Sequence, residues 1–311
     1  MAKILVTGGA GFIGSHLVDK LVERKHRVVV IDNLSTGFQS NLNPKARFYR
    51  MDIGSDKVDA IFRKERFDYL FHFAAQVDVR KSLANPALDV QTNILGSMNL
   101  LLSCRKYGVK KVVFASTGGA IYGEQDYFPA DEKHPELPIS PYGVAKLTVE
   151  KYLNFYYQIY GLPYVALRFA NVYGPRQNPK GDSGVVAIFS EKLLKDEPVN
   201  IYGNGRQTRD YVFVQDVVRA ALLALRSRVV GSYNIGTGRE TSVNRLFGMI
   251  QTRLNSRSKV TYQPQRAGEQ ARSSLNYTFA KKHLGWSPAC DLQKGLDLTL
   301  KYYAQKIKSN L

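Results

Sequence analysis

The chain contains little cysteine and no long apolar run. Its two cysteines, Cys104 and Cys290, are too few for a disulfide framework or a metal-ligand cluster, so we expect no bound metal and a reducing, cytoplasmic setting. The longest apolar runs, at 28–31 and 112–115, are far shorter than the ~20 residues of a membrane-spanning helix. The N-terminus leads directly into a strand-like segment and a glycine turn, unlike a signal peptide. We therefore expect neither membrane insertion nor secretion.

Acidic residues are also few, because 26 Asp and Glu stand against 44 Lys and Arg and give a net charge of +18. Such a charge attracts nucleic acids. The basic residues, however, occur as scattered pairs such as Lys110-Lys111, without interleaved aromatic residues or a nucleic-acid motif. We expect no specific nucleic-acid partner. The positive charge suits an anionic small substrate, or is solvated surface.

Strand-length and helix-length segments alternate through the first half of the sequence. The expected strands span 3–7, 27–32, 47–51, 69–73, 111–116 and 164–169. Apolar strands spaced by helices are typical of a parallel sheet that is covered on both faces. The sequence therefore predicts an α/β fold with a Rossmann-type doubly wound parallel sheet.

The alternation breaks down after Asn171. Helices are expected over 185–194, from near Asp216, over 243–254 and over 292–307, and extended segments over 199–202 and near 260–262. We expect a nucleotide-binding domain at 1–170, completed by parts of 210–236, and a smaller α/β substrate domain at 171–311.

A glycine-rich turn follows the first strand, in the segment 7–14 with the sequence TGGAGFIG. Gly8, Gly11 and Gly14 allow a sharp turn, close approach of a pyrophosphate to backbone N–H groups, and close packing of the helix on the strand. The second strand ends at Asp32, where a carboxylate can accept hydrogen bonds from a ribose diol and repel a 2′-phosphate. The pattern predicts NAD rather than NADP.

Tyr142 and Lys146 lie four residues apart behind an expected helix start at Ser140-Pro141. A tyrosine hydroxyl acts as a base near neutral pH only beside positive charge, which Lys146 would supply. The spacing alone proves little, since Tyr107/Lys111, Tyr277/Lys281 and Tyr302/Lys306 share it. Only Tyr142 begins a helix after the loop that follows the fifth strand.

That loop, 116–123, places the hydroxyls of Ser116 and Thr117 at the end of the strand. Thr117 could hydrogen-bond the reacting oxygen of a substrate. The alternative is that both hydroxyls only cap the strand and satisfy a turn. Asp52, at the end of the third strand, has a similar alternative: it could bind an adenine amino group or be a solvated carboxylate.

With these residues in place, the chain resembles the extended short-chain dehydrogenase/reductase family and, within it, the UDP-glucose 4-epimerases. The resemblance rests on 7–14, the Tyr142/Lys146 pair, and the segments 171–176, 209–211 and 234–238. It implies a homodimer that uses bound NAD. The residues expected to contact NAD are Gly8, Gly11, Phe12, Ile13, Gly14, Asp32, Asn33, Asp52, Ile53, Phe73, Ala74, Ala75, Asn93, Ser116, Tyr142 and Lys146.

The resemblance also implies a UDP-hexose substrate and a catalytic group of Tyr142, Lys146 and Thr117. The residues expected to face the substrate are Thr117, Tyr142, Asn171, Val185, Val186, Tyr202, Arg209, Arg266, Glu269 and Ser273. Tyr202 would stack on uracil, and Arg209 would bind the pyrophosphate. The small side chain of Ser273 would leave room for an N-acetyl group on the hexose.

The implied reaction is epimerisation at C4 by transient oxidation, with hydride returned to the opposite face of the sugar. Related dehydratases usually carry an Asp-Glu pair where this sequence has Gly118-Gly119, so elimination is disfavoured. The glycine pair makes the loop one residue longer than in most epimerases of the family. The alternatives are another nucleotide-sugar epimerase, decarboxylase or dehydratase, or a non-catalytic NAD-binding sensor.

Overall fold

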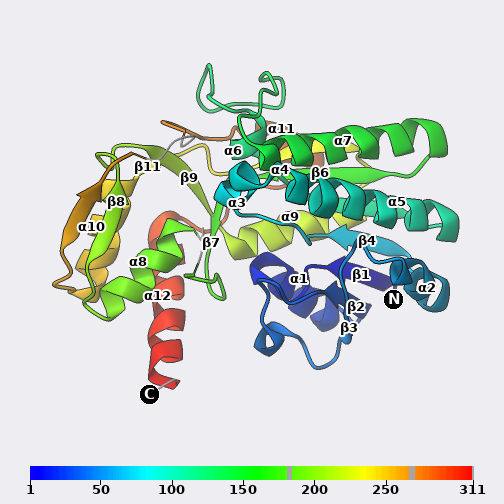
Figure 1. Cartoon of the computed structure of the whole chain (residues 1–311), viewed down its shortest axis with the longest axis horizontal. Helices are drawn as coiled ribbons and strands as arrows, with labels where there is room; N and C mark the ends of the chain where they lie inside the picture. Colours follow the sequence, from blue (N-terminus) through cyan, green and yellow to red (C-terminus); the bar gives the residue numbers. More distant parts are fainter. Residues whose placement is uncertain (181–183, 266–269, 310–311) are drawn as a thin grey trace.

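The computed structural model describes residues 1–180, 184–265 and 270–309. A seven-stranded sheet runs through the molecule in the order β10-β6-β5-β4-β1-β2-β3, and every neighbouring pair is parallel (Figure 1). The strands are β1 (Lys3–Thr7), β2 (Arg27–Asp32), β3 (Arg47–Arg50), β4 (Tyr69–His72), β5 (Lys111–Thr117), β6 (Tyr164–Phe169) and β10 (Gly231–Ile235).

Helices cover both faces of this sheet. One face holds α1 (Phe12–Glu23), α9 (Val214–Arg226) and α11 (Thr278–Leu284), and the other holds α2 (Lys57–Glu65), α5 (Gly96–Tyr107) and α7 (Pro141–Tyr160). Successive strand residues pack into opposite layers, since Ile4 and Val6 belong to the first core and Leu5 to the second. Burial on both faces explains why the strands read as continuous apolar runs.

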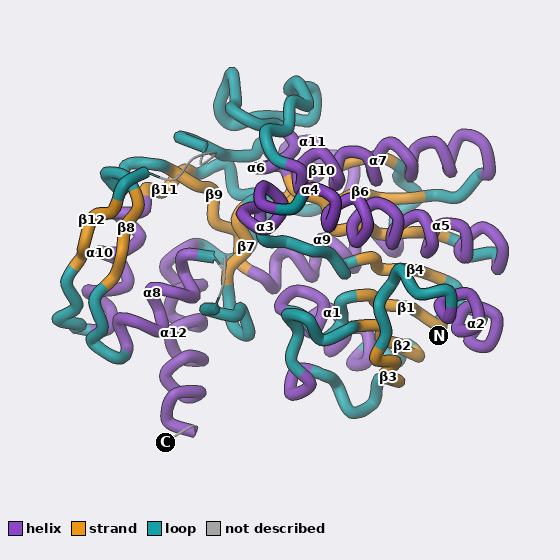
Figure 2. The backbone as a smooth tube through the Cα atoms, in the orientation of Figure 1, coloured by secondary structure: helices purple, strands orange, loops and turns teal. Residues whose placement is uncertain are grey.

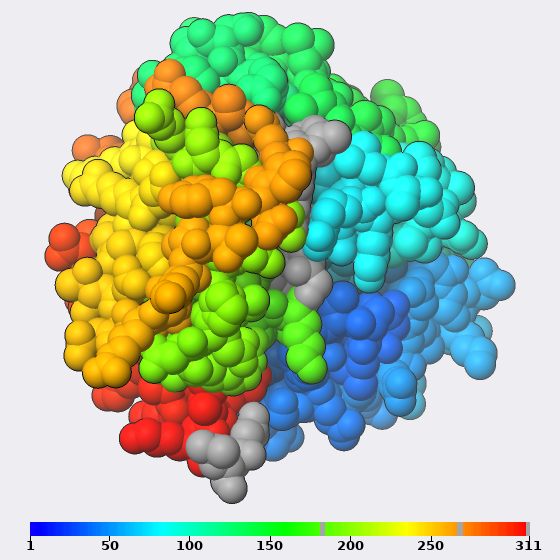
Figure 3. Space-filling view, turned by 60° about the vertical axis from the view of Figure 1, so that its left-hand side comes forward, coloured from blue at the N-terminus to red at the C-terminus, as the bar shows by residue number. Residues whose placement is uncertain are grey.

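The second half of the chain adds a smaller layer beside the sheet. It contains a three-stranded sheet of β11 (Glu240–Ser242), β9 (Thr208–Phe213) and β7 (Asn171–Tyr173), and a pair of β12 (Val260–Gln263) and β8 (Val199–Tyr202). These strands pack with α8 (Val185–Leu194), α10 (Val243–Leu254) and α12 (Leu292–Ser309) around a third core. Figure 3 shows the blue and cyan N-terminal residues on one side of the molecule and the lime-green to red residues of the second half on the other.

The predicted fold class is confirmed, and most expected strands end within one residue of the observed strands. The edge strand β10 comes from the 210–236 region that was expected to complete the first domain, while the boundary near 170 stays a prediction. Short elements were not predicted: η1 (Gln39–Asn41), α3 (Val79–Ala84), α4 (Pro86–Asp89), the π-helical η2 (Val90–Leu95) and α6 (Gly118–Ile121).

The longest irregular segment lies between α6 and α7 and rises away from the sheet as the loop at the top of Figure 2. Cys104 and Cys290 are both free thiols. Within the described ranges, no helix has the length and apolar character needed to cross a membrane.

Candidate active site at the carboxyl edge of the sheet

The glycine turn after β1 is a cradle that side chains would fill. Gly8 has a φ of +72°, and a Cβ on it would lie 2.6 Å from the backbone nitrogen of Ala74. A Cβ on Gly14 would lie 2.1 Å from the carbonyl oxygen of Gly8. Helix α1 then begins at Phe12 after Gly11, and no side chain caps its first turn. Its N–H groups therefore suit the diphosphate of a dinucleotide.

Asp32 fastens this turn to the end of β2. Its carboxylate accepts hydrogen bonds from the backbone of Ala10 at 3.0 Å and of Leu34 at 2.8 Å. Next to it, the amide of Asn33 donates to the carboxylate of Asp52 at 2.8 Å. The structure thus brings together three predicted adenosine-side residues from the ends of β2 and β3, and their contacts to a ligand stay a prediction.

Asn93 holds the segment that follows β4. Its side chain accepts from the backbone N–H of Gln76 at 2.8 Å and donates to the carbonyl of Gln76 at 2.9 Å. Ala74 and Ala75 lead into this segment, and the N–H of Phe73 donates to the carbonyl of Thr7. Asn93 therefore shapes the path along which a nicotinamide would lie.

Ile53 and Phe12, two more of the residues predicted to contact the dinucleotide, pack against other side chains of the fold. Ile53 is buried against the start of α5, where a Cβ on Gly96 would meet its side chain. The ring of Phe12 packs edge-on against His16 within α1. Ile13 is half-buried beside the glycine turn.

Helix α7 carries Tyr142 and Lys146 at its first two turns. The predicted cap is confirmed, because Ser140 accepts a hydrogen bond from the N–H of Gly143 at 3.1 Å and Pro141 is the first helical residue. The ammonium of Lys146 lies 5.8 Å from the centre of the Tyr142 ring and donates to the carbonyl of Ala115 at 2.8 Å. The predicted pair therefore shares one face of α7 beside the end of β5.

Burial sets the electrostatics of this pair. Lys146 is 3% exposed, and burial lowers its pKa to about 7 although Asp89 and Glu150 act to raise it. Burial, with a further contribution from Asp89, raises the pKa of Tyr142 above its usual value. A neutral phenol and a readily titrated ammonium thus face the same edge before any ligand is bound.

The sequence analysis missed Asp89. It is fully buried at the end of α4 and accepts hydrogen bonds from Asn93 at 2.5 Å and from Gln76 at 3.0 Å. Burial raises the pKa of Asp89. Its one signal in the sequence is the helical spacing of four residues from Asn93.

Thr117 and Ser116 point to different partners. Thr117 caps α6, since its hydroxyl oxygen accepts from the N–H of Ala120 at 3.3 Å, which leaves the hydroxyl proton for another acceptor. The alternative that Thr117 satisfies a turn is therefore also observed. Ser116 donates its hydroxyl proton to Glu150, so its side chain could meet a dinucleotide only as an acceptor.

The C-terminal half closes over the loop after β5. Ser273 is 4% exposed, and its hydroxyl oxygen would lie 3.5 Å from a Cβ on Gly119. Gln270 donates to the carbonyl of Gly119 at 2.7 Å. Asp210, which follows Arg209 in β9, accepts hydrogen bonds from the backbone N–H groups of 237, 238 and 275. These bonds hold β9 against the two segments to which those residues belong.

The remaining predicted substrate residues lie in different settings. Tyr202 lines a pocket of about 280 Å³ with Gln207, Gln270 and Arg272 among others. Asn171 is exposed at the start of β7. The α8 helix begins at half-buried Val185, whereas Val186 is 1% exposed and packs into the third core, which leaves only its backbone for a ligand. Arg266 and Glu269 lie outside the described residues.

Comparison with known proteins identifies the family to which the chain belongs. Residues 4–236 match the NAD dependent epimerase/dehydratase family. The chain belongs to this family. The match covers the glycine cradle, Asp32, Thr117 and the Tyr142–Lys146 face.

Similar proteins extend this match over nearly the whole chain. A relative from Methanocaldococcus jannaschii, described as a putative UDP-glucose 4-epimerase, is 48% identical, with 94% of this chain and 95% of the relative covered. The crystal structure of a UDP-glucose 4-epimerase with UDP-glucose from Thermotoga maritima is 51% identical, with a TM-score of 0.97 and 98% and 99% of the two chains covered. A Thermus thermophilus UDP-glucose 4-epimerase in complex with NAD is 44% identical, with a TM-score of 0.93 and 97% and 98% coverage.

Proposed function

We propose that this chain is an NAD-dependent UDP-glucose 4-epimerase, an isomerase that interconverts UDP-glucose and UDP-galactose. The observation that carries the proposal is the position of the Tyr142–Lys146 pair at the same sheet edge as the glycine cradle. Family members that bind UDP-glucose and NAD share this fold at high identity. A non-catalytic sensor would need the cradle alone.

The chain fits NAD at the cradle. The uncapped first turn of α1 would hold the diphosphate, because N–H groups and the helix dipole favour negative charge there. Asp32 would accept hydrogen bonds from the adenosine ribose, since a carboxylate has acceptor positions beyond the two that Ala10 and Leu34 use. When bound, NAD supplies a reversible hydride acceptor for C4 of the hexose.

Tyr142 is the acid and base of the proposed reaction. As the phenolate, its oxygen takes the proton from the C4 hydroxyl, and the resulting phenol returns that proton to the C4 oxygen at the end of the turnover. Lys146 lowers the cost of the phenolate by its charge, which the carbonyl of Ala115 holds in place. Thr117 can donate its free hydroxyl proton to the C4 oxygen.

The 4-keto sugar then has to present its other face. We propose that the UDP group is held while the hexose turns, with Arg209, Tyr202 and the start of α8 on the nucleotide side. Arg209 follows Thr208 in β9, and Tyr202 lines the pocket of about 280 Å³. Arg266, Glu269 and Asn171 are proposed to complete this grip. Firm binding of the nucleotide, together with loose binding of the sugar, allows the 4-keto sugar to be reduced on either of its faces.

The loop after β5 favours hydride return over elimination. Gly118 and Gly119 offer no acid that could protonate a leaving hydroxyl at C6. A Cβ on Gly118 would lie 2.5 Å from the side chain of Leu275, so the loop has no room for a larger residue without movement. This distinguishes the proposed epimerase from a dehydratase of the same family.

Two further proposals concern the substrate and the assembly. Because Ser273 and Gly119 are small and adjacent, we propose that UDP-N-acetylhexosamines are accepted beside UDP-hexoses. We also propose a homodimer through α5 and α7, which lie side by side in Figure 1. The apolar residues exposed on these helices and just before α5 include Leu95, Leu102, Val144, Tyr152, Phe155 and Ile159.

One experiment tests the main proposal. The purified protein is incubated without added oxidant with UDP-galactose and, in a parallel reaction, with UDP-glucuronate. UDP-glucose formation is followed in the first reaction, together with loss of water in both and loss of carbon dioxide from UDP-glucuronate. Formation of UDP-glucose until the two sugars reach equilibrium is expected. Water loss from the sugar would indicate a dehydratase. Absence of any turnover by protein that retains NAD would support the sensor.

A further inference from the structure

A buried ion pair lies behind the candidate active site, between Glu150 of α7 and Arg168 of β6. Each residue is 3% exposed. The Nε of Arg168 lies 3.1 Å from both carboxylate oxygens of Glu150, and a second guanidinium nitrogen lies 2.6 Å from Oε2. Burial acts to lower the pKa of Arg168, but Glu150 and Tyr122 outweigh it and raise that pKa above its usual value. The pair is therefore charged and rigidly oriented.

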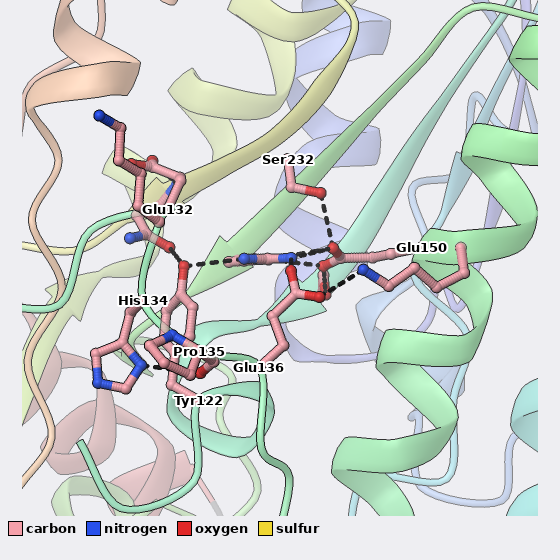
Figure 4. Close-up of polar contacts among 12 residues, drawn as sticks. Tyr122, Glu132, His134, Pro135, Glu136, Glu150 and Ser232 are labelled. Carbon is pink, nitrogen blue, oxygen red and sulfur yellow. Dashed lines mark hydrogen bonds and ion pairs between the residues drawn. The ribbon is translucent and has the colours of Figure 1, made fainter. Parts of the chain in front are cut away.

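The carboxylate of Glu150 also binds the strand that ends in Thr117. It accepts a hydrogen bond from Ser116, the residue before Thr117 in β5, and another from Ser232 of β10 at 2.7 Å (Figure 4). Successive side chains of a strand point to opposite faces. Holding the side chain of Ser116 on one face therefore fixes the direction of Thr117 on the other.

Arg168 holds the chain on the far side of Thr117. Its guanidinium donates to the hydroxyl of Tyr122 at 3.0 Å, and that hydroxyl donates to Asn234 at 2.8 Å. Tyr122 directly follows α6, the short helix that Thr117 caps. The ion pair is thus connected to the residues on both sides of the Thr117 hydroxyl.

The same pair fixes α7 against β5. Glu150 lies one helical turn after Lys146, as Lys146 lies one turn after Tyr142, so the three share a face. Lys146 donates to the carbonyl of Ala115, and Glu150 accepts from the next residue, Ser116. These two contacts, to adjacent residues of β5, fix the position of α7 along the strand.

Stability alone gives a weak reason for this arrangement. Exchanging a buried ion pair for apolar residues of similar size is often neutral or stabilising. Catalysis, in contrast, needs the acid–base group and its hydrogen-bonding partner in one geometry, and a displacement of about 1 Å can cost about 100-fold in rate.

We propose that Glu150 and Arg168 are positioning residues, whose ion pair holds Thr117 and the Tyr142–Lys146 face in one relative geometry. The kinetic test of this positioning role rests on the proposed function. Neither residue touches the substrate. The pair acts through Ser116 and Tyr122 on the strand side and through α7 on the other.

The kinetic test compares Glu150→Gln with Glu65→Gln. Glu65 is a matched control, because it is 4% exposed and pairs with the first residues of β1 and β3, Lys3 at 2.5 Å and Arg47 at 3.1 Å, at the amino ends of these strands. Glu150→Gln is expected to lower kcat by about 10- to 100-fold, with unchanged KM for UDP-galactose and unchanged NAD content. Glu65→Gln is expected to retain the wild-type kcat.

The pH profile gives a readout that loss of packing would not change. Glu150→Gln removes a negative charge that acts to raise the pKa of Lys146, so the limb of the kcat profile set by Lys146 moves to lower pH. Glu65→Gln leaves it in place. Arg168→Lys keeps the charge but loses the two-pronged contact, and it is expected to recover part of the kcat that Arg168→Met loses.

A second set of variants guards against misfolding of the charge variants. Ser116→Ala and Ser232→Ala each remove one hydroxyl donor from Glu150, but only Ser116 adjoins Thr117. A larger loss of kcat in Ser116→Ala is expected. Hydrogen exchange at the amides of Ala120 and Tyr122 should also be faster in Glu150→Gln than in Glu65→Gln, whether or not the wild type turns over UDP-galactose.

The outcomes separate the two proposals. A wild type without epimerase activity overturns the proposed function, and the exchange comparison then decides the positioning role alone. An active wild type with equal kcat and equal exchange in Glu150→Gln and Glu65→Gln overturns the positioning role. Equal kcat in the two serine variants overturns it as well.

Discussion

The ammonium of Lys146 lies 2.8 Å from the carbonyl oxygen of Ala115, two residues before Thr117 in β5. A buried lysine would otherwise be free to change rotamer, so this contact holds its charge at a constant distance from the Tyr142 ring. It also ties α7 to β5, the strand that ends in Thr117. Lys146, one member of the proposed acid–base pair, is therefore part of the fold's own hydrogen bonding.

Tyr142→Phe is expected to lower the turnover of UDP-galactose by about 100- to 10,000-fold, because the general acid and base is lost. NAD should remain bound, since the cradle at Gly8 and Asp32 is unchanged. The measurement is UDP-glucose formation together with NAD content after dialysis. Tyr107→Phe is the control, as Tyr107 has a lysine at the same interval but donates to Asp59 on α2. Comparable activity in the two variants would contradict the role of Tyr142.

In the protein without NAD, Lys146→Met is expected to raise the free energy of unfolding by an amount that depends on pH. The pKa of Lys146 is about 7 in the fold and about 10.5 when unfolded. Between these values the unfolded chain binds more protons, so this group makes the free energy of unfolding rise with pH. The variant should therefore be more stable than wild type below pH 7, with the advantage shrinking toward pH 10.

Thermal unfolding at several pH values measures this difference. Lys20→Met provides the control, since Lys20 lies at an exposed position in α1 and forms a surface ion pair with Glu23. A difference between Lys146→Met and wild type that is the same at pH 6 and pH 10 would show that burial does not perturb Lys146 as inferred.

The sheet could be predicted closely from the sequence because its strands are buried on both faces. Runs such as 27–32 are apolar for both layers, so their bounds follow from composition alone. The three-residue strand β7 and the one-turn helix α6 carry too few residues for a periodic pattern. Both form because of contacts with distant segments, such as β9 beside β7.

The glycine turn of the candidate site could be predicted because a short motif reflects a local need for space, as at Gly8 and Gly14. Glu150 and Arg168 were missed because their role depends on pairing across the fold. Arg168 meets Glu150 because β6 pairs with β5 in a register that sets it opposite Ser116. Sequence spacing carries no record of that register.

Asp32→Ala is expected to weaken NAD binding by about 10- to 100-fold, the effect of losing hydrogen bonds to a charged group. The proposed ribose contact is lost, and so are the two backbone contacts that fasten the glycine turn. Titration calorimetry on protein freed of NAD provides the measurement. Asp59→Ala, which removes an exposed carboxylate of α2 that pairs with Lys106, should bind NAD as wild type does. Unchanged affinity in Asp32→Ala would remove Asp32 from the proposed site.

Phe155→Glu is expected to weaken self-association, because it places a charge in the apolar surface of α7 proposed to meet a second copy. Analytical ultracentrifugation over a range of concentrations measures the shift from dimer to monomer. Leu298→Glu makes the same kind of change at an exposed position in α12 and should leave association unchanged. A wild type that sediments as a monomer at all concentrations would contradict the dimer.

Ser273→Tyr is expected to lower activity on UDP-N-acetylglucosamine relative to activity on UDP-glucose. A Cβ on Gly119 would lie in van der Waals contact with the Ser273 hydroxyl, at 3.5 Å, so a large side chain at position 273 would occupy the space proposed for the N-acetyl group. A steric penalty of about 1–3 kcal/mol corresponds to a loss of about 5- to 150-fold in kcat/KM for the larger substrate relative to the smaller one. Ser273→Ala should retain both activities. If the wild type turns over UDP-glucose but not UDP-N-acetylglucosamine, the space beside Ser273 is not the determinant of substrate size.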